Sequence, residues 1–187
     1  IYSCPQSLFK IHPDFDDVIL KILKNDKNAK IYFIKGKEIS FTKKTFERLK
    51  KKVGIDIDKI TFLDQMTTEE YINHCGRASV LLDPFYFGAG NSFHESMFYG
   101  TPTISKPNQF MRSKIVEGAY KQMKIEEPPI FKSLDEYVHK AIEIANFSPQ
   151  KILETKKYFS KCADENLFEN NEALKDFQNT LLNIIRK

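Results

Sequence analysis

Short apolar runs alternate with amphipathic stretches along this chain. The apolar runs predict five strands, at residues 2–5, 30–34, 60–63, 80–82 and 102–105. Between the strands, apolar residues recur at helical spacing, and one clear stripe consists of Phe15, Val18, Ile19, Ile22 and Leu23. Strands that alternate with helices predict βαβ units and a parallel sheet. The pattern therefore predicts an α/β fold, a doubly wound Rossmann-like parallel sheet with C-terminal helices.

Polar residues and glycines predict where the helices begin and end. Thr67 and Glu70 have the spacing of a capping box, and glycines 54 and 100 are placed to end helices. Helices are expected at residues 42–53, 67–76, 93–99, 113–123 and 134–145. Another helix is expected to have Pro13 in its first turn, and a further one begins at residue 148. A last helix carries the apolar residues Leu174, Phe177, Leu181, Ile184 and Ile185.

The segment between residues 79 and 100 joins an apolar strand to a helix through a glycine loop. Gly88 and Gly90 lead into Asn91 and Ser92, two residue types that are favoured at helix N-caps. A strand, a glycine loop and a helix start in this order direct backbone N–H groups at an anion, so we predict that the loop holds the phosphates of a nucleotide. The spacing alone favours a simpler turn that needs glycine for backbone reasons, because neither the dinucleotide fingerprint nor the P-loop motif is complete.

The predicted sheet topology adds support for an anion site. In doubly wound sheets, ligands bind beyond the carboxyl ends of the strands. Three loops are expected at that edge, formed by residues 6–10, 66–68 and 87–92. Their convergence predicts a shared pocket.

Composition narrows the class of protein. The chain has 187 residues, of which 41% are apolar, and this predicts one compact domain spanning residues 1–187. No apolar run is long enough to cross a membrane, and no signal peptide is recognised. The chain opens at Ile1 in a predicted strand, so we expect it to be excised from a longer protein. Three cysteines without Cys-x-x-Cys spacing indicate reduced thiols in a cytoplasmic protein.

Charge and acidic motifs suggest neither nucleic-acid binding nor a metal site. The net charge is +4, and the densest lysine runs, at residues 43–44 and 50–52, are typical of the solvated face of a helix. Asp56 and Asp58 spell an Asp-x-Asp motif, but they lie in a short connection that is expected to be a turn. The four histidines lack metal-ligand spacing, so no metal site is predicted.

Three blocks of the sequence, in order, resemble one enzyme family. They are residues 4–13 (CPQSLFKIHP), residues 83–102 (DPFYFGAGNSFHESMFYGTP), and residues 110–114 (FMRSK) followed by 119–123 (AYKQM). They are similar to the O-GlcNAc transferase and SPINDLY-like glycosyltransferases. The similarity is greatest to bacterial members, in which a Gly-Gly-Gly-Asn-Thr-Thr-type loop occupies the place of the glycine loop.

The resemblance implies the C-terminal half of a GT-B glycosyltransferase, the half that binds the sugar nucleotide. Members transfer GlcNAc from UDP-GlcNAc, or fucose from GDP-fucose in the SPINDLY branch, to Ser or Thr hydroxyls of proteins, and a related branch glycosylates Asn. They invert the anomeric centre and need neither a metal nor another cofactor. The protein acceptor and the general base would then be bound outside this chain, by an N-terminal domain or by tetratricopeptide repeats. The isolated chain is expected to bind nucleotide weakly and to be inactive.

The resemblance also assigns roles to individual positions. Lys10 matches the lysine that contacts the diphosphate and stabilises the departing nucleotide, which makes it the candidate catalytic residue. The candidate nucleotide-sugar-binding residues are Gln6, Ser7, Met66, Thr68, Tyr71, Gly88, Gly90, Asn91, Ser92, Glu95 and Arg112. Within this set, Asn91 and Ser92 match positions that hold the diphosphate, and Glu95 matches an acid on the ribose hydroxyls. The base is expected along Met66, Thr68 and Tyr71.

Several of these positions have a second interpretation. Asn91 and Ser92 could also be ordinary helix N-caps, and Tyr71 could be a core residue. Arg112 lies at a helix start, where a solvated cation is also common. Gly90 replaces a histidine of animal members, as it does in bacterial ones, so a side-chain contact to the diphosphate would become at best a backbone contact.

Two other functions remain open from the sequence. A non-catalytic interaction module could retain the glycosyltransferase scaffold and bind an acidic partner through its lysine-rich helices. A glycosyltransferase of the same architecture could instead act on a glycan acceptor.

Overall fold

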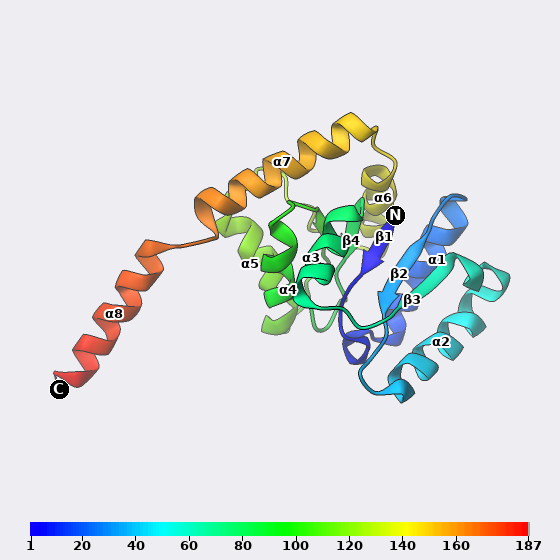
Figure 1. Ribbon diagram of the computed structural model, residues 1–187, viewed down its shortest axis with the longest axis horizontal. Helices are drawn as coiled ribbons and strands as arrows, with labels where there is room; N and C mark the ends of the chain where they lie inside the picture. The colour runs from blue at the N-terminus through cyan, green and yellow to red at the C-terminus, as the bar shows by residue number, and fades with distance from the viewer. Residues whose placement is uncertain (187) are drawn as a thin grey trace.

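The computed structural model describes residues 1–186 and contains a five-stranded sheet (Figure 1). The strands are β1 (Tyr2–Cys4), β2 (Ile31–Ile34), β3 (Ile60–Leu63), β4 (Val80–Leu82) and β5 (Thr103–Ile104). They lie in the order β3-β2-β1-β4-β5, and every neighbouring pair is parallel. This is the doubly wound parallel sheet that the alternation of strands and helices predicted.

Eight α-helices and four short 3₁₀ helices connect and follow the strands in residues 1–186. The α-helices are α1 (Asp16–Asn25), α2 (Ile39–Val53), α3 (Thr68–Arg77), α4 (Asn91–Met97), α5 (Ile115–Gln122), α6 (Leu134–Ala145), α7 (Pro149–Asn166) and α8 (Asn171–Ile185). The 3₁₀ helices are η1 (Leu8–Lys10), η2 (Pro13–Phe15), η3 (Gly54–Lys59) and η4 (Met111–Ser113).

Two local predictions outside the candidate site differ from the structure. Helix α2 begins at Ile39, earlier than the predicted start at Thr42. The Thr42 hydroxyl accepts a hydrogen bond from the Gly36 N–H (2.9 Å), so Thr42 closes the preceding loop from inside the first helical turn. Asp56 lies in a 3₁₀ helix, where its carboxylate pairs with the Lys59 ammonium at 2.9 Å.

The start of α3 is held by the predicted capping box. The Thr67 hydroxyl accepts from the Glu70 N–H (3.3 Å), while the Glu70 carboxylate accepts from the Thr67 N–H (2.8 Å). Such caps stabilise a helix start by about 1 kcal/mol. The capping box therefore fixes the loop that leads from β3 into α3.

The core is divided between the two faces of the sheet. Neighbouring residues of a strand point to opposite faces, and Leu82 packs with α1, α2 and α6, whereas Leu81 packs with Cys75 of α3. The predicted stripe of α1 is buried in the first of these clusters. Helices α4, α5 and α7 form a further cluster around Phe93, Tyr120 and Phe159. The loop that follows β4 consequently lies between separately packed layers.

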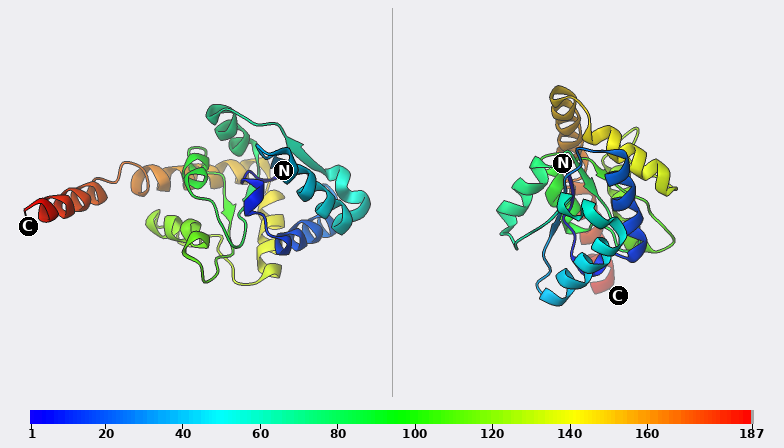
Figure 2. Two further views of the ribbon diagram at one scale, coloured as in Figure 1. Left: turned by 90° about the horizontal axis from the view of Figure 1, so that it is seen from below. Right: turned by 90° about the vertical axis from the view of Figure 1, so that its right-hand side faces the viewer.

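Helix α8 extends away from the rest of the chain (Figures 1 and 2). Its predicted apolar residues are exposed, among them Phe177 at 63% and Ile185 at 78%. Among residues 1–186, none of the helices combines the length and the apolar composition that crossing a membrane requires.

Candidate functional site

The candidate site lies at β1, where the order in which successive strands are added to the sheet reverses. Strand β1 lies between β2 and β4, so the connections from β1 and from β4 leave toward opposite sides. In doubly wound sheets, this arrangement opens a crevice beyond the carboxyl ends of the two central strands. The loop and 3₁₀ helix at residues 6–10 follow β1, and the glycine loop, residues 88–90, follows β4.

A network of hydrogen bonds joins these two loops. The Lys10 ammonium donates to the Gln6 side-chain oxygen (3.0 Å) and to the Gly88 carbonyl (3.3 Å). The Gln6 amide nitrogen donates to the Ser92 hydroxyl (2.8 Å). We call Gln6, Lys10, Gly88 and Ser92 the Lys10 cluster. The structure thus brings the predicted catalytic lysine beside the glycine loop and the start of α4.

Partial burial increases the electrostatic influence of Lys10. Burial lowers the pKa of its ammonium, and the nearby Asp83 carboxylate opposes that shift. The ammonium also lies 4.5 Å from the centre of the Phe87 ring. A cation that is partly removed from water attracts a phosphate group more strongly than a fully solvated one.

The start of α4 differs from the capping that the sequence suggested. Gly90 occupies the N-cap position, and no side chain caps the helix. The Ser92 hydroxyl contacts Gln6 instead, while Asn91 is exposed at the first helical position. Within residues 1–186, the N–H groups of Asn91 and Ser92 have no protein acceptor. Both groups are therefore free to donate to an anion.

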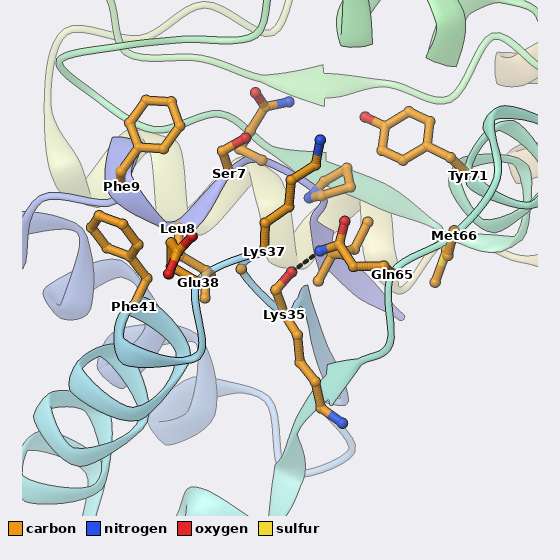
Figure 3. Close-up of a pocket in the computed structure, with 14 residues that line it drawn as sticks. Ser7, Leu8, Phe9, Lys35, Lys37, Glu38, Phe41, Gln65, Met66 and Tyr71 are labelled. Atoms are coloured by element: carbon orange, nitrogen blue, oxygen red, sulfur yellow. Dashed lines mark hydrogen bonds between the residues drawn. The ribbon is translucent and has the colours of Figure 1, made fainter.

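A pocket of about 460 Å³ lies beside the Lys10 cluster, and its size suits a small ligand (Figure 3). Four of the predicted binding residues line it: Gln6, Ser7, Met66 and Tyr71. Figure 3 shows the Lys37 ammonium reaching into the space between Ser7 and Tyr71. The Tyr71 hydroxyl is buried, and the side chains of Cys75 and Ser92 lie near it.

Three further predicted residues, Thr68, Glu95 and Arg112, do not line the pocket. Thr68 is exposed at the first position of α3. Glu95 lies on α4 near Cys75 of α3. Burial of the Cys75 thiol raises its pKa to about 12, and the negative charge of Glu95 adds to this shift. Arg112 donates to the Tyr86 carbonyl (2.9 Å) and stacks over the Phe110 ring at 4.8 Å. Arg112 therefore supports the rim of the glycine loop.

Sequence reasoning missed part of the pocket wall. Lys35, Lys37, Phe9, Phe41 and Gln65 also line the cavity. Lys35 and Lys37 belong to the loop that follows β2, and the rule that ligands bind at carboxyl ends of strands applies to that loop as well. This rule would have identified both lysines. Among residues 1–186, no group of three His, Cys, Asp or Glu side chains has an arrangement that could hold a metal ion.

Curated proteins that are similar to this chain in sequence include a plant and a bacterial glycosyltransferase, whereas no protein-family model matches it. One is the probable UDP-N-acetylglucosamine–peptide N-acetylglucosaminyltransferase SEC of Arabidopsis thaliana, 24% identical over 153 residues, which are 80% of this chain and 15% of that protein. The other is the UDP-glucose:protein N-beta-glucosyltransferase of Actinobacillus pleuropneumoniae serotype 5b, 26% identical over 152 residues, which are 80% of this chain and 24% of that protein. The chain thus spans no more than about a quarter of either relative.

A solved structure shows the same fold. It is a mutant of the Thermobaculum terrenum O-GlcNAc transferase, with a TM-score of 0.81 and 15% sequence identity. The match covers 95% of this chain and 35% of that one. Together with the two sequence relatives, it confirms that the chain resembles the O-GlcNAc transferase and SPINDLY-like family of glycosyltransferases.

Proposed function

We propose that this chain is the nucleotide-sugar-binding part of a glycosyltransferase that acts on proteins. The observation that carries the proposal is the Lys10 cluster, which joins the loops after β1 and β4 beside a pocket large enough for a small ligand. The plant and the Actinobacillus relatives are named as enzymes that transfer a sugar from a UDP-sugar to a peptide or protein. A UDP-sugar such as UDP-GlcNAc is therefore the proposed donor.

The proposed chemistry is stabilisation of the leaving group. Negative charge builds up on the diphosphate as the bond to the sugar breaks, and a fixed cation favours that state over the bound substrate. Lys10 supplies the cation, and the free N–H groups of Asn91 and Ser92 supply neutral donors. No step requires a metal in this scheme, and sugar transfer would invert the anomeric centre.

The pocket would hold the nucleoside and orient the sugar. Met66 and Tyr71 line the pocket, and in this proposal they would contact the base. Lys37 would approach the diphosphate from the opposite wall, because its ammonium reaches into the pocket (Figure 3). The acceptor hydroxyl of Ser or Thr and the general base would be presented by a segment outside these 187 residues. The isolated chain is accordingly expected to bind donor and not to turn over.

Calorimetric titration of the folded chain with UDP, GDP and ADP tests this proposal. UDP is expected to bind weakly, but more tightly than GDP and ADP. Absence of binding by all three nucleotides in a folded sample would contradict a donor-binding role.

Replacing Lys37 tests the geometry of the pocket. Lys37→Ala is expected to weaken UDP binding about three- to tenfold, because one exposed cation contributes on the order of 1 kcal/mol to holding a phosphate. Lys44→Ala is the matched control, because Lys44 is exposed on α2 and does not line the pocket. Equal affinities of the two variants for UDP would show that Lys37 does not contact the nucleotide.

A further inference from the structure

A buried carboxylate lies directly beneath the glycine loop. Asp83 follows β4 and is 1% exposed. One of its oxygens accepts from the Ala89 N–H (2.6 Å), and the other accepts from the Ser105 hydroxyl (2.6 Å). The second buried acid of the described core, Asp16, is paired with the Arg48 guanidinium at 2.7 Å, whereas Asp83 has no ion pair within residues 1–186.

Asp83 determines the shape of the loop that contacts Lys10. A Cβ atom on Gly88 would lie 2.9 Å from an Asp83 carboxylate oxygen, so the loop rests against the acid and a side chain at position 88 would force one of the two to shift. The Gly88 carbonyl then accepts from the Lys10 ammonium (3.3 Å). The contact between Asp83 and the loop therefore positions one wall of the proposed diphosphate site.

The hydrogen bonds of Asp83 are compatible with either protonation state. Ionised, the carboxylate accepts from both Ala89 and Ser105. Protonated, it can still accept from the Ala89 N–H and can donate its own proton to the Ser105 oxygen, because a serine hydroxyl both donates and accepts. A proton on Asp83 consequently changes the charge beneath the loop and leaves the loop geometry in place.

Among residues 1–186, Lys10 is the one charged group whose electrostatic field shifts the pKa of Asp83. Burial raises the pKa of Asp83 to about 7, against the opposing effects of its hydrogen bonds and of the Lys10 charge. Cys4 of β1, Tyr120 of α5 and Tyr137 of α6 are titratable groups that also act electrostatically with Asp83. Burial raises the pKa of all three far above neutrality, so they remain uncharged where Asp83 titrates.

We propose that Asp83 is a positioning residue of the diphosphate site that takes up a proton from solvent when a nucleotide sugar binds. The reason is electrostatic: a diphosphate at Lys10 and the glycine loop brings negative charge close to a buried negative charge, and protonation of Asp83 removes the repulsion. By linkage, a ligand that favours the protonated acid binds more tightly at lower pH. This inference rests on the proposed donor-binding function.

Calorimetry with UDP-N-acetylglucosamine measures the proton directly. This probe is suitable because its diphosphate is a diester and does not itself titrate near neutrality. Titrations at pH 7 in two buffers of different ionisation enthalpy are expected to show net proton uptake, and the dissociation constant is expected to rise roughly five- to tenfold from pH 6 to pH 8. Absence of uptake and of pH dependence, with binding intact, would overturn the inference and leave the proposed function standing.

Two variants separate the charge of Asp83 from its structural role. Asp83→Asn keeps the shape and both hydrogen bonds, so it is expected to bind at pH 8 as tightly as the wild type does at pH 6, with no proton uptake and little pH dependence. Ser105→Ala removes a donor that stabilises the ionised carboxylate, so the midpoint of the pH dependence should move upward.

Each remaining outcome is decisive. Uptake that persists in Asp83→Asn would belong to Lys10 and would overturn the assignment to Asp83. If Asp83→Asn does not fold, the upward shift in Ser105→Ala carries the test, and an unchanged midpoint contradicts the inference. If no UDP-sugar binds the folded wild-type chain, the proposed function fails and this inference fails with it.

Discussion

Replacing Lys10 with alanine in the proposed glycosyltransferase is expected to lower turnover roughly 10²- to 10³-fold, the range observed when an enzyme loses one preorganised group that stabilises transition-state charge. Donor affinity should fall much less, because the full charge on the diphosphate develops only as the sugar departs. Lys10 is suited to this role by its contacts, since its ammonium bridges Gln6 and the Gly88 carbonyl.

Steady-state kinetics with UDP-GlcNAc and an acceptor peptide would separate the two effects through kcat and KM. Lys24→Ala is the matched control, because Lys24 is an exposed lysine on α1 that does not line the pocket. Turnover in Lys10→Ala that equals that of Lys24→Ala would remove Lys10 from the catalytic machinery.

Gly100→Ala is expected to be the most destabilising alanine substitution among the glycines. Gly100 has a φ of +63°, which L-residues rarely adopt, and a Cβ there would lie 2.0 Å from the Lys156 carbonyl oxygen and 2.5 Å from the Ser160 nitrogen. Both atoms belong to the backbone of α7, so they cannot move aside as a flexible side chain could. We expect a loss of about 3 kcal/mol or more in the free energy of unfolding.

Thermal unfolding followed by circular dichroism would measure this loss as a decrease in Tm of roughly 6–12 °C for a chain of this size. Gly118→Ala is the control, and it is expected to raise Tm instead of lowering it. Gly118 lies inside α5, and a Cβ atom there would have no neighbouring atom within 4 Å, so alanine should stabilise the helix by about 0.5–1 kcal/mol. Equal Tm values for the two variants would refute the predicted packing of Gly100 against α7.

Much of the fold follows from local patterns in the sequence. Apolar runs of three to five residues and amphipathic stripes predicted the parallel sheet, because the periods of strands and helices are properties of neighbouring residues. The capping box at Thr67 and Glu70 was recognisable for the same reason. The start of α2 was predicted too late, because the Thr42 side chain closes a loop contact that sequence spacing does not reveal.

The candidate site depends more strongly on tertiary structure. Lys10 and Gly88 are 78 residues apart, and their contact exists because β1 and β4 are neighbours in the sheet. Gly90 occupies the N-cap position of α4, and the Ser92 hydroxyl contacts Gln6 from the other loop instead of capping the helix. Lys37 lines the pocket because its loop follows β2, which is the other neighbour of β1 in the sheet.

The sequence by itself determined the α/β class, the positions of the strands and most helices, and the motifs that resemble a glycosyltransferase family. Only the tertiary structure decided which loops meet, that Asp83 is buried beneath the glycine loop, and that α7 excludes any side chain at Gly100. The physical reason is the range of the interactions. Helix and strand periods, caps and turns act over a few residues, whereas burial, charge and close backbone contact depend on strand order and on packing between distant segments.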